Sequence, residues 1–99
     1  MNATNVPITL FRLGRIVATP NALGKLTQSD ILTALQRHQT GDWGDVDEED
    51  RQANDRALHE GTRLFSVYHS ATGIKFWVIT EADRSATTFL LPEDSRRPK

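Results

Sequence analysis

Acidic and imidazole side chains gather around one glycine-containing stretch, so a metal site is the first chemistry to consider. His38 is followed by Asp42, Asp45 and Asp47, and imidazole and carboxylate groups are common ligands of divalent cations. Their spacing matches neither two histidines one helical turn apart nor the alternating ligands of a calcium loop with its central glycine. We interpret the acids as a solvated loop that leads into a helix. No metal ligand and no cofactor are predicted.

A second group of polar side chains surrounds a predicted hairpin turn: Glu81, Asp83, Arg84, Thr87 and Thr88. Acid, guanidinium and hydroxyl groups at one sheet edge are what a metal-independent ribonuclease uses to move protons and hold phosphate. The candidate bases for such an enzyme are the three histidines of the chain, His38, His59 and His69. The interpretation that we favour is a turn in which local side-chain hydrogen bonds hold Asp83, Arg84 and Ser85.

Aromatic residues indicate a third kind of site, a binding surface. The predicted pairing of two strands places Tyr68 opposite Trp77, with Lys75 one step along the same face. An exposed apolar patch with one cation is typical of a binding surface. The alternative, which stays open, is that the N-terminal strand and its helix cover this face. The predicted binding residues are Tyr68, Lys75, Trp77, Glu81, Asp83, Arg84 and Trp43.

Three strands that would position these side chains are predicted between residues 63 and 92, where β-branched and aromatic residues dominate three short runs. A turn at Thr72-Gly73 would put one set of side chains on the core face, with Phe65, Val67 and His69 opposite Thr80, Val78 and Phe76. A four-residue loop at 82–85 would place Val78 opposite Phe89 and Trp77 opposite Leu90. Both turns assign the same two faces to the middle strand.

Helices are predicted before this three-stranded region. Residues 8–18 supply an opening strand that Gly14 interrupts, and Thr19-Pro20 begins a short helical turn that runs to residue 26. Thr27 caps a longer helix that carries Asp30 at its third position. A second main helix spans 47–60 and ends at a glycine.

Trp43, between the two main helices, and Asn54, within the second, are interpreted as structural residues. Trp43 lies between glycines and is interpreted as a buried side chain that docks the loop on the sheet, with an exposed anchor as the alternative. Asn54 stands among alanines, and we interpret it as a satisfied polar group that ties the helix to a loop, rather than as a catalytic amide.

Composition limits the classes of protein further. With 99 residues, 8–92 are expected to form one α+β domain, with flexible termini at 1–7 and 93–99. The 12 basic and 13 acidic residues nearly balance, which disfavours a nucleic-acid partner. The absence of cysteine excludes disulfides, thiolate catalysis and cysteine zinc sites. No run approaches the ~18 apolar residues of a membrane span, so a cytoplasmic protein is expected.

The motifs GDWG at 41–44 and ITEADRSATTFLLPED at 79–94, with Glu49-Asp50 and Asn54 between them, resemble a family of small, mostly uncharacterised bacterial proteins. Members occur on plasmids, integrative elements and phages, and some are labelled as a type I restriction subunit. The resemblance covers about residues 13–94. Members commonly end in a tyrosine just after LLPED, where this chain has Ser95. The chain also lacks the Asn-Pro-Pro-aromatic methylation motif and a glycine-rich cofactor loop, so the resemblance implies a mobile-element context and no particular chemistry.

The expected fold is α+β: an antiparallel sheet of three or four strands with two main helices packed on one face. The expected function is that of a non-enzymatic accessory protein of a mobile genetic element, which binds a macromolecular partner in defence or anti-defence, like anti-restriction or anti-CRISPR proteins. A protein partner is favoured, with a homodimer as an alternative and no membrane association. The alternative function is a small metal-independent ribonuclease toxin of the barnase or RelE type, by analogy of fold alone.

Overall fold

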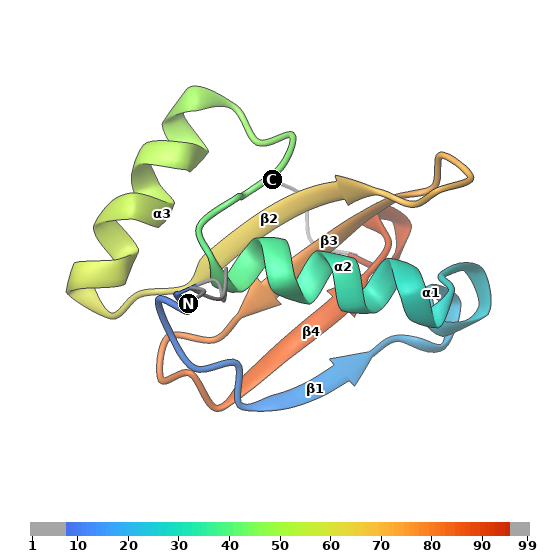
Figure 1. The fold of residues 1–99 in the computed structure, drawn as a ribbon, viewed down its shortest axis with the longest axis horizontal. Coiled ribbons are helices and arrows are strands. Elements are labelled where there is room, and N and C mark those ends of the chain that lie inside the picture. Colours follow the sequence, from blue (N-terminus) through green and yellow to red (C-terminus); the bar gives the residue numbers. More distant parts are fainter. Residues whose placement is uncertain (1–7, 96–99) are drawn as a thin grey trace, which may run out of the picture.

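The computed structural model describes residues 8–95, which form an α+β fold with a four-stranded sheet and three α-helices (Figure 1). The predicted fold class is therefore confirmed. In chain order the elements are β1 (Arg15–Ala18), α1 (Pro20–Lys25), α2 (Gln28–Gln39), α3 (Glu48–Glu60), β2 (Leu64–His69), β3 (Lys75–Thr80), β4 (Ala86–Leu90) and the 3-10 helix Pro92–Asp94.

The sheet is mixed, with strand order β1-β4-β3-β2. β2, β3 and β4 form the predicted antiparallel meander, but β1 pairs with β4 in parallel. The expectation of a wholly antiparallel sheet was wrong in this detail. All three helices separate β1 from the meander, and a connection of that length can return the chain in either direction.

The register of the two hairpins was predicted with unequal success. Val78 pairs with Phe89, as predicted from the second turn. The first hairpin is displaced by one residue, so that Tyr68 pairs with Phe76 and Val67 pairs with Trp77. Because side chains alternate along a strand, this displacement moves every side chain of β2 to the other face.

The hairpin loop between β2 and β3 explains the displacement. The backbone N–H of Ser70 donates to the Ile74 carbonyl at 2.8 Å, which leaves a loop of three residues rather than two. The Ser70 hydroxyl oxygen accepts hydrogen bonds from the N–H groups of Thr72 (3.3 Å) and Ile74 (3.0 Å). Gly73 adopts φ 88° at the end of the loop, as three-residue hairpin loops require.

Two helix boundaries follow the prediction, the start of α2 after the cap Thr27 and the end of α3 at Gly61. At α2, the Thr27 side chain accepts from the Asp30 N–H and the Asp30 carboxylate accepts from the Thr27 N–H, a reciprocal capping box. The Asp47 carboxylate accepts from the Asp50 N–H at the start of α3. That helix ends at Gly61, which takes the left-handed conformation with φ 72°.

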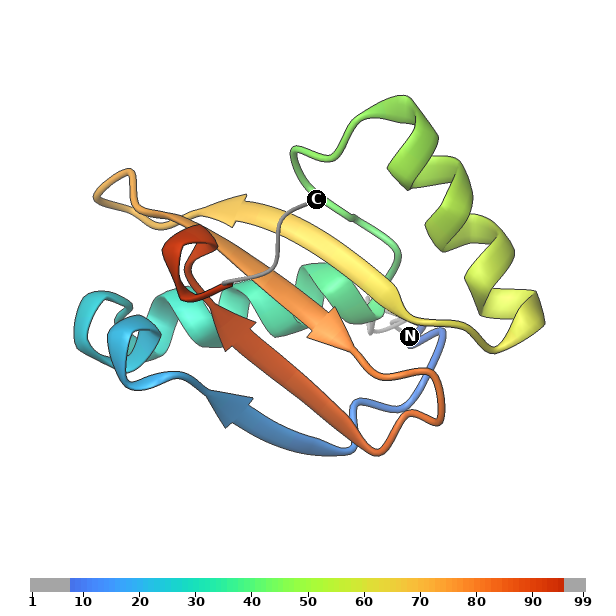
Figure 2. The same cartoon turned by 180° about the vertical axis from the view of Figure 1, so that it is seen from behind.

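The core lies between α2 and one face of the sheet (Figure 1). Its buried apolar side chains are Ala22, Leu26, Ala34, Tyr68, Phe76, Val78, Phe89 and Leu91. α3 packs at the β2 end of this layer, where Ala57 meets Trp43 and Leu64 in a second buried cluster. Figure 2 shows the opposite face of the sheet, over which none of the three α-helices of residues 8–95 lies.

The chain continues as an ordered turn beyond the meander. The Asp94 carboxylate accepts hydrogen bonds from the Thr19 hydroxyl at 2.6 Å and from the Leu91 N–H at 2.9 Å. Glu93 and Asp94 are therefore held in a 3-10 helix, contrary to the expected flexible tail from residue 93. The expectation of flexibility at 1–7 and 96–99 lies outside the described residues.

Candidate functional site

The sheet face opposite α2 carries a contiguous, mostly apolar surface, which we call the open face. The strand registers place its side chains in two rows, Phe65–Ile79–Thr88–Val17 and Val67–Trp77–Leu90. The first row crosses all four strands. Figure 2 views the sheet from this side, where no α-helix of the described chain lies and the 3-10 helix Pro92–Asp94 stands in front of one end of β3 only.

Mutual packing reduces the exposure of these side chains without burying most of them. The rings of Phe65 and Trp77 meet edge to face, with centroids 5.4 Å apart and an interplanar angle of 76°. Both rings are half-buried, as are Ile79 and Leu90. Val17, at the edge of the sheet, retains 37 % of its exposure. The open face is thus apolar surface that the described part of the chain leaves in contact with solvent.

Cations lie at the two ends of the open face. Lys75 begins β3 and is exposed, and Arg15 begins β1 at the opposite end of the sheet and is also exposed. At that same end, the Arg63 guanidinium lies 3.5 Å from the Glu81 carboxylate across the β2–β3 pair. The predicted site residues Trp77, Lys75 and Glu81 therefore belong to this face of the sheet or its rim.

Tyr68 lies on the other face of the sheet, so the predicted Tyr68–Trp77 pair was wrong. Its side chain is 2 % exposed, and its hydroxyl donates a hydrogen bond to the Asp42 carbonyl at 2.6 Å. The Arg37 guanidinium lies over the ring at 4.6 Å from its centroid. Burial raises the pKa of the phenol above its ordinary value. Tyr68 is a core residue and does not contribute to the open face.

Trp43 also lies inside the molecule. It is 4 % exposed and stacks on Phe11 with centroids 6.2 Å apart, while its Nε1 donates to the Asp55 carboxylate at 3.2 Å. The structure thus supports the interpretation of Trp43 as a buried docking residue. Its inclusion among the binding residues was wrong.

The polar turn between β3 and β4 holds the fold together. Arg84 takes φ 61°, and its two terminal nitrogens donate to four backbone carbonyls, those of Thr62, Glu81, Ala82 and Ala57. These bonds tie the turn to the end of α3. The Asp83 carboxylate accepts from the Ser85 N–H at 3.0 Å, and its hydrogen bonds with Ser85 lower the pKa of the carboxyl. The locally bonded turn that we favoured is what the structure contains.

His38 is completely buried, with its ring nitrogens bonded to two hydroxyls. Nδ1 lies 2.6 Å from the Ser66 hydroxyl oxygen, and Nε2 lies 2.9 Å from that of Thr80. Burial, reinforced by the positive charge of Arg84, lowers the pKa of His38 to about 4. The imidazole is therefore neutral at pH 7 and has no access to a substrate.

The buried hydroxyls continue this network to the segment before β1, and their donors can be ordered. Thr87 donates its hydroxyl proton to the Leu13 carbonyl at 2.7 Å, so Thr80 donates to Thr87 over its 2.7 Å contact. Thr80 must then accept from Nε2–H of His38, whose Nδ1 accepts from Ser66. Sequence reasoning missed this network, because serine and threonine at these positions look like ordinary strand residues.

The acids once considered as metal ligands have separate partners. Asp42 accepts two hydrogen bonds from the Arg37 guanidinium, at 2.8 and 3.1 Å, and these bonds lower its pKa. The Asp45 carboxylate lies 2.9 Å from Nδ1 of His69, while Asp47 caps α3. Within residues 8–95, no three histidine, aspartate or glutamate side chains are placed to hold a metal ion.

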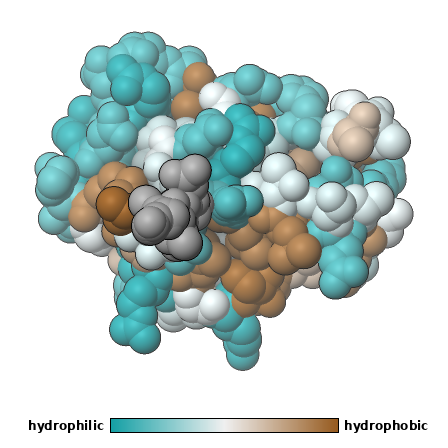
Figure 3. Space-filling view, in the orientation of Figure 1, coloured by the Kyte–Doolittle hydropathy of each residue, from teal (hydrophilic) through white to brown (hydrophobic). Residues whose placement is uncertain are grey.

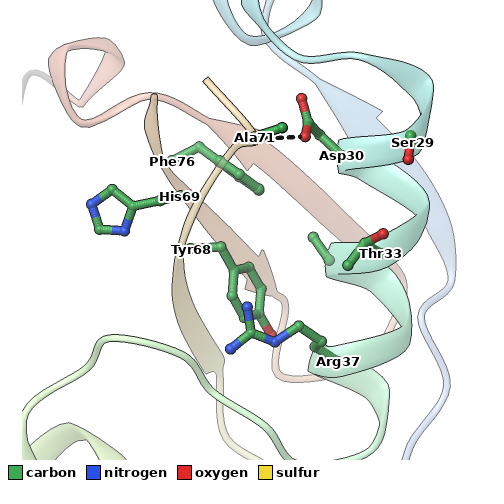
Figure 4. A pocket seen from close by; sticks show the side chains of 9 residues that line it. Ser29, Asp30, Thr33, Arg37, Tyr68, His69, Ala71 and Phe76 are labelled. Carbon is green, nitrogen blue, oxygen red and sulfur yellow. Dashed lines mark hydrogen bonds between the residues drawn. The ribbon is translucent and has the colours of Figure 1, made fainter. Parts of the chain in front are cut away.

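A small pocket lies between α2 and the β2–β3 hairpin (Figure 4). Its volume is about 260 Å³ and its floor includes Tyr68 and Phe76. Its two charged ends are already engaged: Asp30 accepts from the Ala71 N–H at 3.1 Å, and Arg37 pairs with Asp42. The pocket is smaller than most small-molecule sites, and its charges serve the fold.

The outer edge of β2 is covered by the chain itself. The Asn54 amide nitrogen donates to the Phe65 carbonyl at 2.7 Å, and its side-chain oxygen accepts from the Phe65 N–H at 3.0 Å. Val67 N–H donates to the Trp43 carbonyl at 3.0 Å, and Asp45 N–H donates to the Val67 carbonyl at 2.8 Å. Asn54 is thus a satisfied structural amide, as interpreted from the sequence, although it ties α3 to a strand rather than to a loop.

Comparison of the chain with known protein families, with curated proteins and with solved structures finds no match. None of the helices in the described part of the chain is long and apolar enough to cross a lipid bilayer. The geometry of the open face, the covered β2 edge and the buried network is therefore what bears on function.

Proposed function

We propose that this chain is a non-enzymatic binding protein that docks a protein partner on its open face. The observation that carries the proposal is the row Phe65–Ile79–Thr88–Val17, next to Trp77 and Leu90, on a sheet face that no α-helix of residues 8–95 covers. Contiguous apolar surface of this kind marks interaction sites on soluble domains.

The composition of the open face supports a protein rather than a nucleic acid as the partner. Trp77 stands on a central strand with Phe65 and Leu90 on the neighbouring strands, and central aromatic residues dominate the energetics of many protein interfaces. The net charge of −1 gives little general attraction for a polyanion. Lys75 and Arg15 at the two ends suit a partner with acidic groups beside an apolar centre.

The resemblance to small proteins of mobile elements adds a biological setting to this proposal. An accessory protein of a plasmid or phage acts by binding a host or element-encoded macromolecule. We extend the proposal to such a role in defence or anti-defence. The partner would then be a component of a bacterial defence system.

The ribonuclease alternative loses one of its three candidate bases and its candidate phosphate ligand. Its candidate base His38 is 0 % exposed and bonded on both ring nitrogens. In its candidate phosphate ligand, Arg84, both terminal nitrogens already donate hydrogen bonds to backbone carbonyls. A phosphate would have to displace these internal bonds.

The proposal is tested with one variant on the open face and one elsewhere. The wild-type protein and Trp77→Ala are used as bait in a lysate of the source organism, with Gln52→Ala as the control on the exposed side of α3. The captured protein is then purified and its affinity measured by calorimetry. We expect the Trp77→Ala variant to bind at least ~30-fold more weakly, because a central interface aromatic contributes ~2 kcal/mol or more. The control should bind as the wild type does.

Three results would contradict the proposal. The first is equal capture by wild type and Trp77→Ala. The second is tighter binding of single-stranded oligonucleotides than of any captured protein, which would make nucleic acid the partner. The third is cleavage of RNA by the purified protein in the presence of EDTA, with loss of cleavage in the Arg84→Ala variant.

A further inference from the structure

The two edges of the sheet are treated differently by the chain. At β2, the Asn54 amide and the backbone at 43–45 pair with the outward N–H and C=O groups of Phe65 and Val67. At the other edge, β1 pairs only with β4. Figures 1 and 2 both show β1 at the boundary of the molecule, with no other element beside it.

The hydrogen bonds on the inner side of β1 identify the backbone groups on its outer side. Arg15 N–H donates to the Ser85 carbonyl at 2.9 Å and Thr19 N–H donates to the Phe89 carbonyl at 3.0 Å. Alternate residues of a strand point their backbone groups to opposite edges. The N–H and C=O groups of Ile16 and Ala18 therefore point outward, and within residues 8–95 these N–H groups donate no backbone hydrogen bond and these carbonyls accept none.

Apolar side chains flank this bare edge on both faces of the sheet. Ile16 is 43 % exposed on the α2 side, and Val17 is 37 % exposed on the open face. Leu32 of α2 is 60 % exposed. Figure 3 shows hydrophobic surface over the middle of α2 and between α2 and β1. Edge strands of monomeric proteins are usually protected by charge, proline or a covering segment. Within residues 15–18, the charge of Arg15 at the start of the strand is the only such feature.

We infer that a second copy of this chain occupies the β1 edge by antiparallel strand pairing. The two sheets would join into one sheet about a two-fold axis. Such an axis places the same patch of both subunits in contact, and it keeps the two α2 helices on the same side of the joined sheet. The exposed apolar surface between α2 and β1 of each copy then faces that of the other. This interaction adjoins the proposed partner site at Val17 and would join two open faces side by side.

Backbone geometry allows only registers in which the outward residues of the two strands lie opposite each other. The register that pairs both outward residues of β1, Ile16 with Ala18, centres the two-fold axis on Val17. Ile16 of each copy then exchanges both backbone hydrogen bonds with Ala18 of the other. Val17 faces its own counterpart in a non-hydrogen-bonded pair, where Cα atoms lie ~4.5 Å apart. Arg15 lies opposite Thr19 of the other copy, so no like charges meet.

The absence of cysteine from the chain allows a direct test of this register. In the Val17→Cys variant, the only two thiols of the dimer would face each other at a separation that a disulfide can bridge. We expect a disulfide-linked dimer on a non-reducing gel after mild oxidation at low micromolar concentration. The Thr72→Cys variant, on the exposed hairpin loop, should stay mostly monomeric under the same conditions. Equal cross-linking of both variants would overturn the inferred register.

Sedimentation velocity tests the interface without a cross-link. The wild type is expected to sediment as a dimer at micromolar concentration, and Ile16→Pro to dimerise at least tenfold more weakly. Proline removes an N–H that no described residue uses, and edge strands tolerate it. Circular dichroism would check that Ile16→Pro is folded, and Ile16→Lys is the second variant should Ile16→Pro unfold.

The Trp77→Ala variant should still dimerise, which separates this inference from the partner site. A wild type that remains monomeric at several hundred micromolar, or a folded Ile16 variant that dimerises normally, would overturn the inference.

Discussion

His38 lies at the centre of a hydrogen-bond network that runs through the core from β2 to the segment before β1. Ser66, Thr80 and Thr87 are each fully buried, and an unpaired buried hydroxyl would cost about 1–3 kcal/mol. The imidazole joins the hydroxyl of β2 to that of β3, and the network ends on the Leu13 carbonyl. A single neutral side chain therefore satisfies polar groups on two strands at once.

This burial predicts a pH dependence of stability. The pKa of His38 is about 4 in the folded protein and about 6.5 in an unfolded chain. The unfolded state binds more protons in this window, so the free energy of unfolding falls as pH drops from 6.5 toward 4. The full loss approaches about 3 kcal/mol. The lowered pKa values of Asp30 and Asp42 act at lower pH, where these carboxyls become protonated in the unfolded chain first.

Urea unfolding at pH 7, 6 and 5 measures this dependence, because the two carboxylates stay ionised over that range. The His38→Gln variant is the control. It should be less stable at every pH, and its loss of stability between pH 7 and 5 should be clearly smaller than that of the wild type. Equal losses in the two proteins would show that His38 is not the group responsible.

At the scale of elements, the GDWG loop and α3 act together to cover the edge of β2. Gly44 forms a parallel bridge to Val67 with φ 77°, and a Cβ at Gly44 would lie 2.0 Å from the Val67 carbonyl oxygen. Only glycine permits this approach of two backbones. The Asn54 amide occupies the next pair of edge groups along the strand. Coverage of this kind keeps an edge strand from pairing with other chains.

The Asn54→Ala variant is expected to lose about 2–4 kcal/mol of unfolding free energy, because it removes two hydrogen bonds and leaves the N–H and C=O of Phe65 unpaired. Chemical denaturation measures the loss, and hydrogen exchange should show faster exchange of the Phe65 amide. Gln52→Ala is the matched control on the exposed side of α3, with an expected change within about 0.5 kcal/mol. An unchanged exchange rate at Phe65 in Asn54→Ala would contradict the assigned role.

At the scale of the whole molecule, the sheet separates two environments. On the α2 side, the side chains of Phe76, Val78 and Phe89 are at most 1 % exposed. On the open face, Trp77, Ile79 and Leu90 from the same two strands remain half-buried. The α2 side of the sheet therefore forms the core, whereas the open face keeps the partly exposed apolar surface on which we propose that a partner docks.

Two large-to-small substitutions should reveal this asymmetry. Phe89→Ala creates a cavity in the core and should cost about 3–5 kcal/mol of unfolding free energy. Trp77→Ala removes a larger side chain, yet it should cost less than half of that amount, because solvent already reaches the ring. Urea denaturation of both variants compares them directly. Similar losses would mean that the open face is packed as a core in solution.

Local features of the fold were determined by the sequence alone. The capping residue Thr27, the helix end at Gly61, and the register of the β3–β4 hairpin were all predicted, because each depends on groups a few residues apart. The α+β class followed from the same signals. The locally bonded turn at Asp83 and Arg84 was also the favoured interpretation of its residue types.

Tertiary structure decided the rest, because the deciding contacts join residues that are far apart in the chain or depend on exact backbone geometry. One extra loop residue at the first hairpin moved Tyr68 into the core and placed Val67 beside Trp77 on the open face. The parallel pairing of β1 with β4, the four carbonyls around Arg84 and the partners of His38 come from packing between distant segments. Side-chain type shows that a residue can form a hydrogen bond or pack in a core, but only the folded chain brings it to its partner.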